Sequence, residues 1–128
     1  MREITYIYGF VHFRSRRDLA QTAQIVADVL GIHLVPDAEG IYEEFPAYIG
    51  HALGLEVAVL GPPDDSALQE ECQFSEVGVI QLRPAPGFGS YETRFKGDID
   101  ISANLEELLQ TATDFEILPN RGPVFRHA

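Results

Sequence analysis

The stretch ITYIYGFVHF, residues 4–13, is apolar on both of its alternating sides. One side carries Tyr6, Tyr8 and Phe10, and the other carries Ile7, Val11 and Phe13. A strand that faces water on one side alternates apolar with polar residues, whereas a strand covered on both faces does not. The stretch therefore predicts a central strand, and the fold depends on what covers each of its sides.

Two helices are predicted beside this strand. The first has a capping-box pattern at Ser15 and Asp18 and a glycine at position 31 that is expected to end it. Its apolar positions recur at helical spacing at Leu19, Ala23, Val26 and Leu30. The second is expected to be capped by Ser102, with one apolar face made by Leu105, Leu108, Leu109 and Ala112.

Three further strands are expected. Residues 55–61 and 72–83 are separated by a proline-containing turn and are predicted to pair as a long hairpin, and residues 115–118 form the last strand. Between the first helix and the hairpin, a short helix is predicted to begin at Pro46 and to end at Gly54. The pattern leaves residues 32–45 and 91–95 undecided between strand and loop, and residues 119–128 read as an irregular tail.

The order of these elements predicts an α+β protein that forms a single domain over residues 1–128. Strand, helix, insertion, strand, strand, helix and strand follow the ferredoxin-like, or split βαβ, arrangement, which has an antiparallel sheet with two helices on one face. Residues 32–54 would be an insertion before the second strand. The alternative is another α+β sandwich with a different strand order.

The chain is strongly acidic. It has 20 Asp and Glu against 9 Lys and Arg, for a formal net charge of -11. Because phosphate binding needs clustered cations, we expect no nucleic-acid partner and no anionic membrane, and a protein partner with a basic surface would be attracted. The alternative is that the acidity only keeps the protein soluble. A single cysteine, Cys72, and an amino terminus unlike a signal peptide favour a cytoplasmic location.

No pattern in the sequence indicates catalysis, a metal or a cofactor. The stretch YEEFPAYIGHALG, residues 42–54, places Glu43 and Glu44 before His51, but the glutamates would lie at the positive end of the predicted helix and His51 would face solvent. The histidines lack metal-ligand spacing, and Cys72 stands among glutamates that disfavour a thiolate. We therefore expect no catalytic residues, although the question of enzymatic activity stays open.

The basic cluster RSRR makes Arg14, Arg16 and Arg17 candidates for binding an anion at the start of the first helix. The alternative is that these arginines pair with nearby carboxylates such as Asp18 or Glu3.

Carboxylate pairs recur along the chain, and most fall at loops or at the ends of elements. These pairs are Glu43 with Glu44, Asp64 with Asp65, Glu70 with Glu71, Asp98 with Asp100 and Glu106 with Glu107. The first three pairs are the candidates for contacting a basic partner, together with the aromatic side chains of Tyr6, Tyr8 and Phe10. On a sheet face without helices, these rings must be covered by the insertion, by a second copy of the chain or by a protein partner.

With these carboxylate pairs and the segment YEEFPAYIGHALGLEVAVLGPPDD, the chain resembles the small acidic immunity proteins of bacterial polymorphic-toxin and contact-dependent inhibition systems. The resemblance is one of overall style and assigns no binding residue. It implies a stoichiometric inhibitor that occludes the active site of a cognate toxin. Two alternatives are a ferredoxin-like enzyme or ligand-binding domain with a cleft near His12 and residues 14–17, and a structural homo-oligomer, such as a homodimer.

Overall fold

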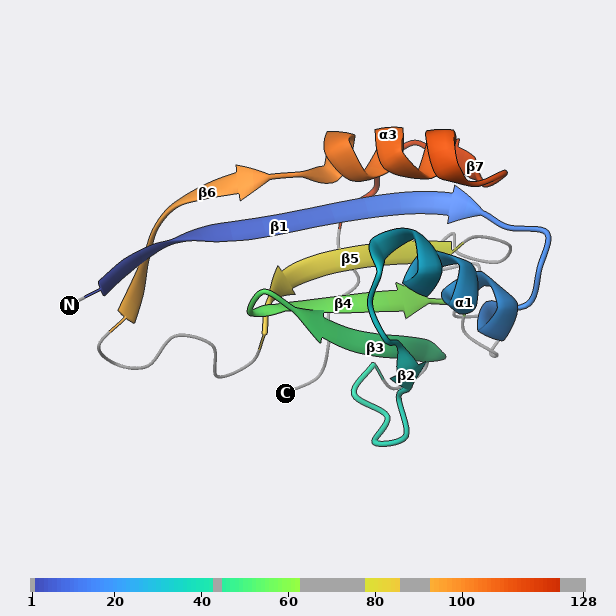
Figure 1. Ribbon diagram of the computed structural model, residues 1–128, viewed down its shortest axis with the longest axis horizontal. Helices are drawn as coiled ribbons and strands as arrows, with labels where there is room; N and C mark the ends of the chain where they lie inside the picture. The colour runs from blue at the N-terminus through green and yellow to red at the C-terminus, as the bar shows by residue number, and fades with distance from the viewer. Residues whose placement is uncertain (1, 43–44, 63–77, 86–92, 123–128) are drawn as a thin grey trace.

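In the computed structural model, residues 2–42, 45–62, 78–85 and 93–122 are described. Seven strands form one sheet, and two described helices pack on it (Figure 1). The elements in chain order are β1 (Arg2–Arg14), α1 (Leu19–Leu30), β2 (Val35–Pro36), β3 (Ala47–Ala52), β4 (Leu55–Leu60), β5 (Gly78–Pro84), β6 (Thr93–Asp100), α3 (Ser102–Ala112) and β7 (Glu116–Leu118). None of the described helices is long and apolar enough to span a bilayer.

Strand β1 organises the sheet, as the sequence predicts. The strand order is β2-β3-β4-β5-β1-β6, and β7 also pairs with β1. The second half of β1 pairs antiparallel with β5, from Gly9 opposite Leu82 to Phe13 opposite Gly78. The first half pairs with β6, and this is the parallel pairing in the sheet. Strand β1 therefore joins an antiparallel meander, β3-β4-β5, to a separate edge strand.

Both described helices cover the same face of the sheet, as predicted. This helix-covered face carries the odd-numbered residues of β1, and its core consists of Val11, Phe13, Val57, Val59, Ile80 and Leu82 from the strands, Ala23 and Val26 from α1, and Leu105 and Leu109 from α3. Gly9 lets α3 approach β1 closely, because a Cβ atom built there would lie 2.9 Å from Leu105 Cδ1. The opposite face carries the even-numbered residues of β1 and no helix from the described part of the chain, and we call it the helix-free face.

The α+β class and the largely antiparallel sheet are confirmed, but the ferredoxin-like arrangement is not. The sheet has more strands than the predicted arrangement, and the order differs because the insertion contributes β2 and β3 to the meander. The predicted hairpin pairing is present between β4 and β5, while residues 72–77 lie outside the described part of the chain. The undecided residues 93–95 belong to β6, and β7 lies within the predicted last strand.

The helix predicted from Pro46 is wrong, because these residues form strand β3. They pair antiparallel with β4, from Ala47 opposite Leu60 to Ala52 opposite Leu55. Ala47, Ile49 and His51 therefore share one face, on which Ala47 and Ile49 are buried and His51 is exposed. Residues Leu53 and Gly54 then make a two-residue hairpin turn into β4, with φ of 56° and 77°. Type I′ turns require positive φ at both central residues; Gly54 suits this requirement, whereas Leu53 is unusual there.

The helix starts also differ from the prediction in detail. Asp18, rather than Ser15, is the N-cap of α1, and its carboxylate accepts a hydrogen bond from the backbone N–H of Gln21. Gly31 ends the helix in the left-handed region, as predicted. Ser102 is the first residue of α3 instead of its cap, and its N–H and hydroxyl both donate to Asp100 Oδ1.

Candidate functional site: an aromatic strip on the helix-free face

Four aromatic side chains form a continuous row on the helix-free face, which we call the aromatic strip: Tyr6, Tyr8, Phe10 and Phe95. The first three alternate along β1, and Phe95 enters from β6 because it pairs with Ile4 in the parallel register. The ring centroids are 5.1 Å apart for Tyr6 and Phe95, 6.0 Å for Tyr6 and Tyr8, and 5.5 Å for Tyr8 and Phe10. The strip is therefore one surface of touching rings.

The rings of the strip remain partly open to solvent. Tyr6, Tyr8 and Phe10 are half-buried, and Phe95 is 42% exposed. The insertion does not cover the strip with its described residues, because Tyr42, Ile41 and Phe45 pack on a second small core over β3, β4 and β5. As far as the described residues show, the cover that was predicted for these aromatics would have to be a second copy of the chain or a protein partner.

Two carboxylates stand beside the strip on the same face. Asp98 pairs with Tyr6 and Asp100 with Tyr8 in the β1–β6 register, and both acids are exposed. A bulge in β6 makes this possible: two residues, one of them Gly97 at φ 75°, oppose Thr5, so that both Phe95 and Asp98 face the strip. Burial raises the pKa of Tyr8, and the negative charges of Asp100 and Asp98 raise that pKa further.

Part of this site was predictable from the sequence. Tyr6, Tyr8 and Phe10 share the helix-free face as predicted, and the Asp98 and Asp100 pair was recognised as acidic but not placed beside them. Phe95 was missed because residues 91–95 could not be assigned to a strand. The predicted acidic contacts Glu43, Glu44, Asp64, Asp65, Glu70 and Glu71 all lie outside the described residues.

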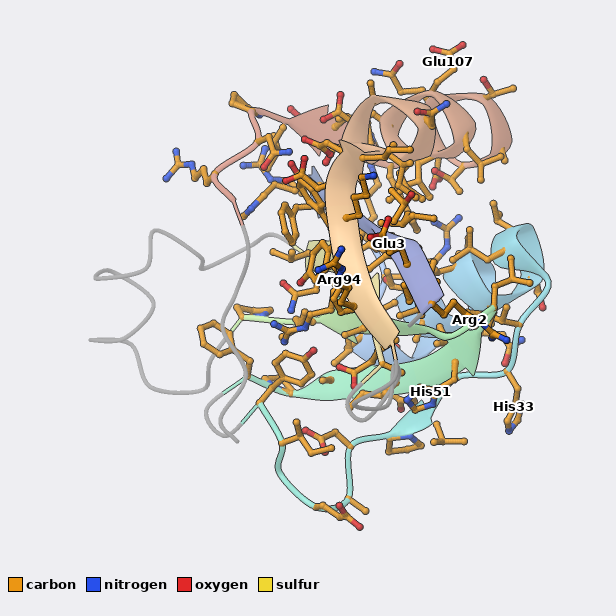
Figure 2. All side chains as sticks on the ribbon, turned by 90° about the vertical axis from the view of Figure 1, so that its left-hand side faces the viewer. Arg2, Glu3, His33, His51, Arg94 and Glu107 are labelled. Carbon is orange, nitrogen blue, oxygen red and sulfur yellow. The ribbon has the colours of Figure 1, made fainter. Side chains whose placement is uncertain are left out.

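A buried polar cluster lies on the helix-free face beyond the strip, and no pattern in the sequence indicated it. The hydroxyl of Tyr42 donates to Glu56 Oε1 at 2.7 Å and accepts from Gln81 Nε2 at 3.3 Å and from Arg83 Nη2 at 3.1 Å. Tyr42, Glu56 and Gln81 are almost completely buried. Exposed His51 lies on β3 with its Nε2 atom 4.0 Å from Glu56 Oε2 (Figure 2).

This cluster fastens the insertion to the sheet. Burial raises the pKa of Tyr42, and the hydrogen bond to Glu56 raises it further, while the donors of Arg83 and Gln81 act in the opposite direction. The tyrosine is thus held in its neutral form, as a donor to the carboxylate. Asp37 secures the same segment, because its carboxylate accepts the backbone N–H groups of Ile41 and Tyr42.

The basic cluster at residues 14–17 is largely engaged in ion pairs, but not with the predicted partners Asp18 and Glu3. Arg17 binds Asp114 through two hydrogen bonds of 2.7 and 3.2 Å, and Arg14 contacts Glu116 at 3.1 Å. The hydrogen bond from Arg17 holds the pKa of Asp114 below its usual range. These partners were missed because they lie far along the chain, Asp114 shortly before β7 and Glu116 as its first residue.

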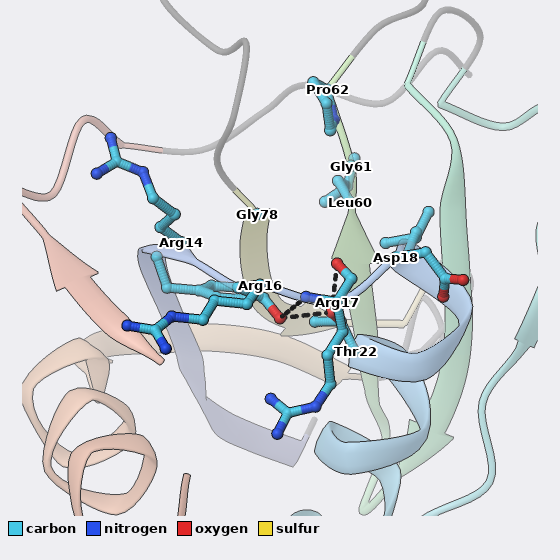
Figure 3. Close-up of a pocket in the computed structure, with 12 residues that line it drawn as sticks. Arg14, Arg16, Arg17, Asp18, Thr22, Leu60, Gly61, Pro62 and Gly78 are labelled. Atoms are coloured by element: carbon cyan, nitrogen blue, oxygen red, sulfur yellow. Dashed lines mark hydrogen bonds between the residues drawn. The ribbon is translucent and has the colours of Figure 1, made fainter. Parts of the chain in front are cut away.

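A cavity of about 550 Å³ adjoins these arginines (Figure 3). Its walls combine the backbone and side chains of residues 14–18 with apolar groups such as Phe13, Leu19 and Leu60. His12 does not line it, contrary to the cleft expected from the sequence. The imidazole lies on the opposite face of β1, is 8% exposed, and has its Nε2 atom 2.8 Å from the carbonyl oxygen of Gly122.

No family model, curated protein or solved structure matches this chain.

Proposed function

We propose that this chain is a non-enzymatic, acidic binding protein that neutralises a basic protein partner in the cytoplasm. In the specific form of the proposal, it is an immunity protein that occludes the active site of a basic toxin. The observation that carries the proposal is the aromatic strip: a partly exposed row of rings on the helix-free face, with Asp98 and Asp100 beside it.

The aromatic composition and the partial exposure of the strip support the proposal that the partner is a protein. Interface cores are enriched in tyrosine and phenylalanine, and a contiguous apolar patch rimmed by polar groups is typical of a binding surface. Tyr6, Tyr8 and Phe10 all project from strand β1 and pack against one another, so less conformational entropy is lost when they are covered.

The charge distribution supports a cationic partner. A chain with net charge -11 accelerates encounter with a basic protein and slows encounter with an acidic one. The same carboxylates argue against single-stranded nucleic acid, although stacked rings on a sheet are its usual platform. Asp98 and Asp100 would repel the phosphates that must follow the rings.

The immunity function predicts that a toxin-like protein is encoded next to the gene for this chain, and the test uses that protein. Co-expression of the two in bacteria should restore growth, and the purified proteins should form a 1:1 complex in which the activity of the toxin is lost. Full toxin activity in the presence of an equimolar or larger amount of this chain would contradict the proposal, as would the absence of any toxin-like neighbour.

A second candidate function is the binding of a small anionic ligand in the cavity beside residues 14–18. The observation in its favour is that Arg16 and the start of α1 adjoin a space large enough for a small molecule. Isothermal titration with inorganic phosphate tests it. Saturable binding that disappears in Arg16→Gln would support this function, and the absence of heat at millimolar phosphate would reject it.

A further inference from the structure

The first half of β1 and the whole of β6 form a two-stranded arm that extends past the meander. Residues 2–8 of β1 pair with β6, whereas pairing with β5 begins only at Gly9. Figure 1 shows β1 and β6 running together beyond the ends of β4 and β5. Two-stranded parallel ribbons are unusual without cover on both faces, so the arm is a surface suited to being covered by something else.

The two faces of this arm carry opposite kinds of charge. On the helix-covered side, Arg94 and Lys96 both form ion pairs with Glu3, and Figure 2 shows Arg94 beside Glu3. On the helix-free side the register places Asp98 and Asp100 next to the rings, and the basic residue on this side, Arg2, lies at the outer end of the arm opposite Thr93, two residues before Ile4. The strip side of the arm is therefore aromatic and anionic.

An aromatic and anionic surface binds cationic side chains by two effects. An ammonium or guanidinium group over the face of a tyrosine or phenylalanine is attracted by the ring quadrupole, and a nearby carboxylate adds an ion pair. The spacing also suits an extended peptide. Alternate residues on one side of an extended chain are about 6.6 Å apart, and neighbouring rings of the strip are 5.1 to 6.0 Å apart.

We propose that the aromatic strip, with Asp98 and Asp100, is the docking site for an extended segment of the basic partner that carries Arg or Lys at alternate positions. This inference rests on the proposed function and names the chemistry that the site recognises. A second copy of the chain fits the arm less well. Edge strand β6 carries Lys96 and a bulge at Gly97, and both features disfavour pairing between edges.

The test uses a fluorescein-labelled peptide of four Arg-Thr repeats and measures its binding by fluorescence anisotropy. Two variants alter the strip, and each has a matched control. Asp98→Asn removes an exposed carboxylate from the strip, and Glu107→Gln removes an exposed carboxylate from α3 (Figure 2). Phe95→Leu removes a ring from the strip face of β6, and Ile99→Val changes an exposed side chain on the opposite face of the same strand.

We expect Asp98→Asn and Phe95→Leu each to weaken peptide binding about threefold, because an exposed cation–π contact or ion pair changes affinity about two- to fivefold. Either control should change the affinity less than about 1.5-fold. Circular dichroism verifies that each variant is folded. Equal weakening by Asp98→Asn and Glu107→Gln would overturn the inference, since binding would then follow overall charge. A Glu-Thr peptide that binds as well as the Arg-Thr peptide would also overturn the inference. The same holds if light scattering detects a dimer in which a second copy covers the strip.

The same variants separate this inference from the proposed function. If the doubly substituted chain, Asp98→Asn with Phe95→Leu, still neutralises the toxin with unchanged affinity, the docking site is wrong and the immunity function stands. If the parent chain binds the peptide as expected but leaves the toxin fully active, the cation-binding strip stands and the immunity function is wrong.

Discussion

Replacing Tyr42 with phenylalanine removes one oxygen atom from the most buried polar cluster in the described part of the protein. That hydroxyl donates to the Glu56 carboxylate at 2.7 Å and accepts from Gln81 and Arg83. Tyr42 is 1% exposed and Glu56 is 2% exposed, so water does not readily replace the lost bond. A hydrogen bond to a charged group contributes about 1.5–3 kcal/mol, and each buried donor that loses its acceptor adds to that cost.

We therefore expect Tyr42→Phe to lower the free energy of unfolding by about 3 kcal/mol. The assay is urea denaturation followed by circular dichroism, with the denaturant dependence of the two proteins compared to verify that only stability has changed. Tyr48→Phe is the control, because Tyr48 is a half-buried tyrosine on β3 whose hydroxyl has no hydrogen bond with the described residues. This control should cost less than about 0.5 kcal/mol. Equal stability of the two variants would refute the role of the cluster in fastening the insertion.

Two further substitutions and one change of pH are tested by the same urea denaturation. Leu53→Asn should stabilise the protein by about 1 kcal/mol, because Leu53 is 95% exposed at φ 56° and asparagine tolerates that backbone region, and no gain would contradict the turn assignment. Gly9→Ala should destabilise the protein by about 2 kcal/mol, because the new methyl group would meet Leu105 Cδ1 at 2.9 Å. Unchanged stability would show that α3 does not pack so closely on β1. The pKa of Tyr42 is raised in the folded protein, so the stability that its hydroxyl contributes is complete below about pH 10, the unfolded pKa, and is lost as the pH rises through the folded pKa. The free energy of unfolding of Tyr42→Phe should therefore decline less steeply at alkaline pH than that of the parent. Parallel curves for the two proteins would contradict this.

The central strand and the two helices were predictable because their signals are local. Residues 4–13 are apolar on both sides, and α1 has both a helical repeat and a glycine at its end, so each element could be assigned without knowledge of its neighbours. Strand β3 was misassigned for a physical reason. Tyr48, Ile49, Ala52 and Leu53 match a helical spacing, but the pairing with β4 places Ala47 and Ile49 in the core and leaves Leu53 at the tip of a turn.

The candidate site was only partly predictable because it depends on pairing between distant segments. Tyr6, Tyr8 and Phe10 share a face by simple alternation, and this could be deduced from the sequence. Phe95 and Asp98 join them only because β6 pairs in parallel with β1 and contains a bulge, and neither feature has a local signature. The Tyr42 cluster likewise brings together residues from the insertion, β4 and β5.

The most direct test of the central claim is the rate at which this chain associates with its basic partner, measured by stopped-flow fluorescence between 20 and about 500 mM salt. If Asp98, Asp100 and the surrounding acidic surface steer the partner onto the aromatic strip, the association rate should fall at least tenfold over this range, and Asp98→Asn should lower it at low salt more than Glu107→Gln does. An association rate that does not change with salt would contradict the account.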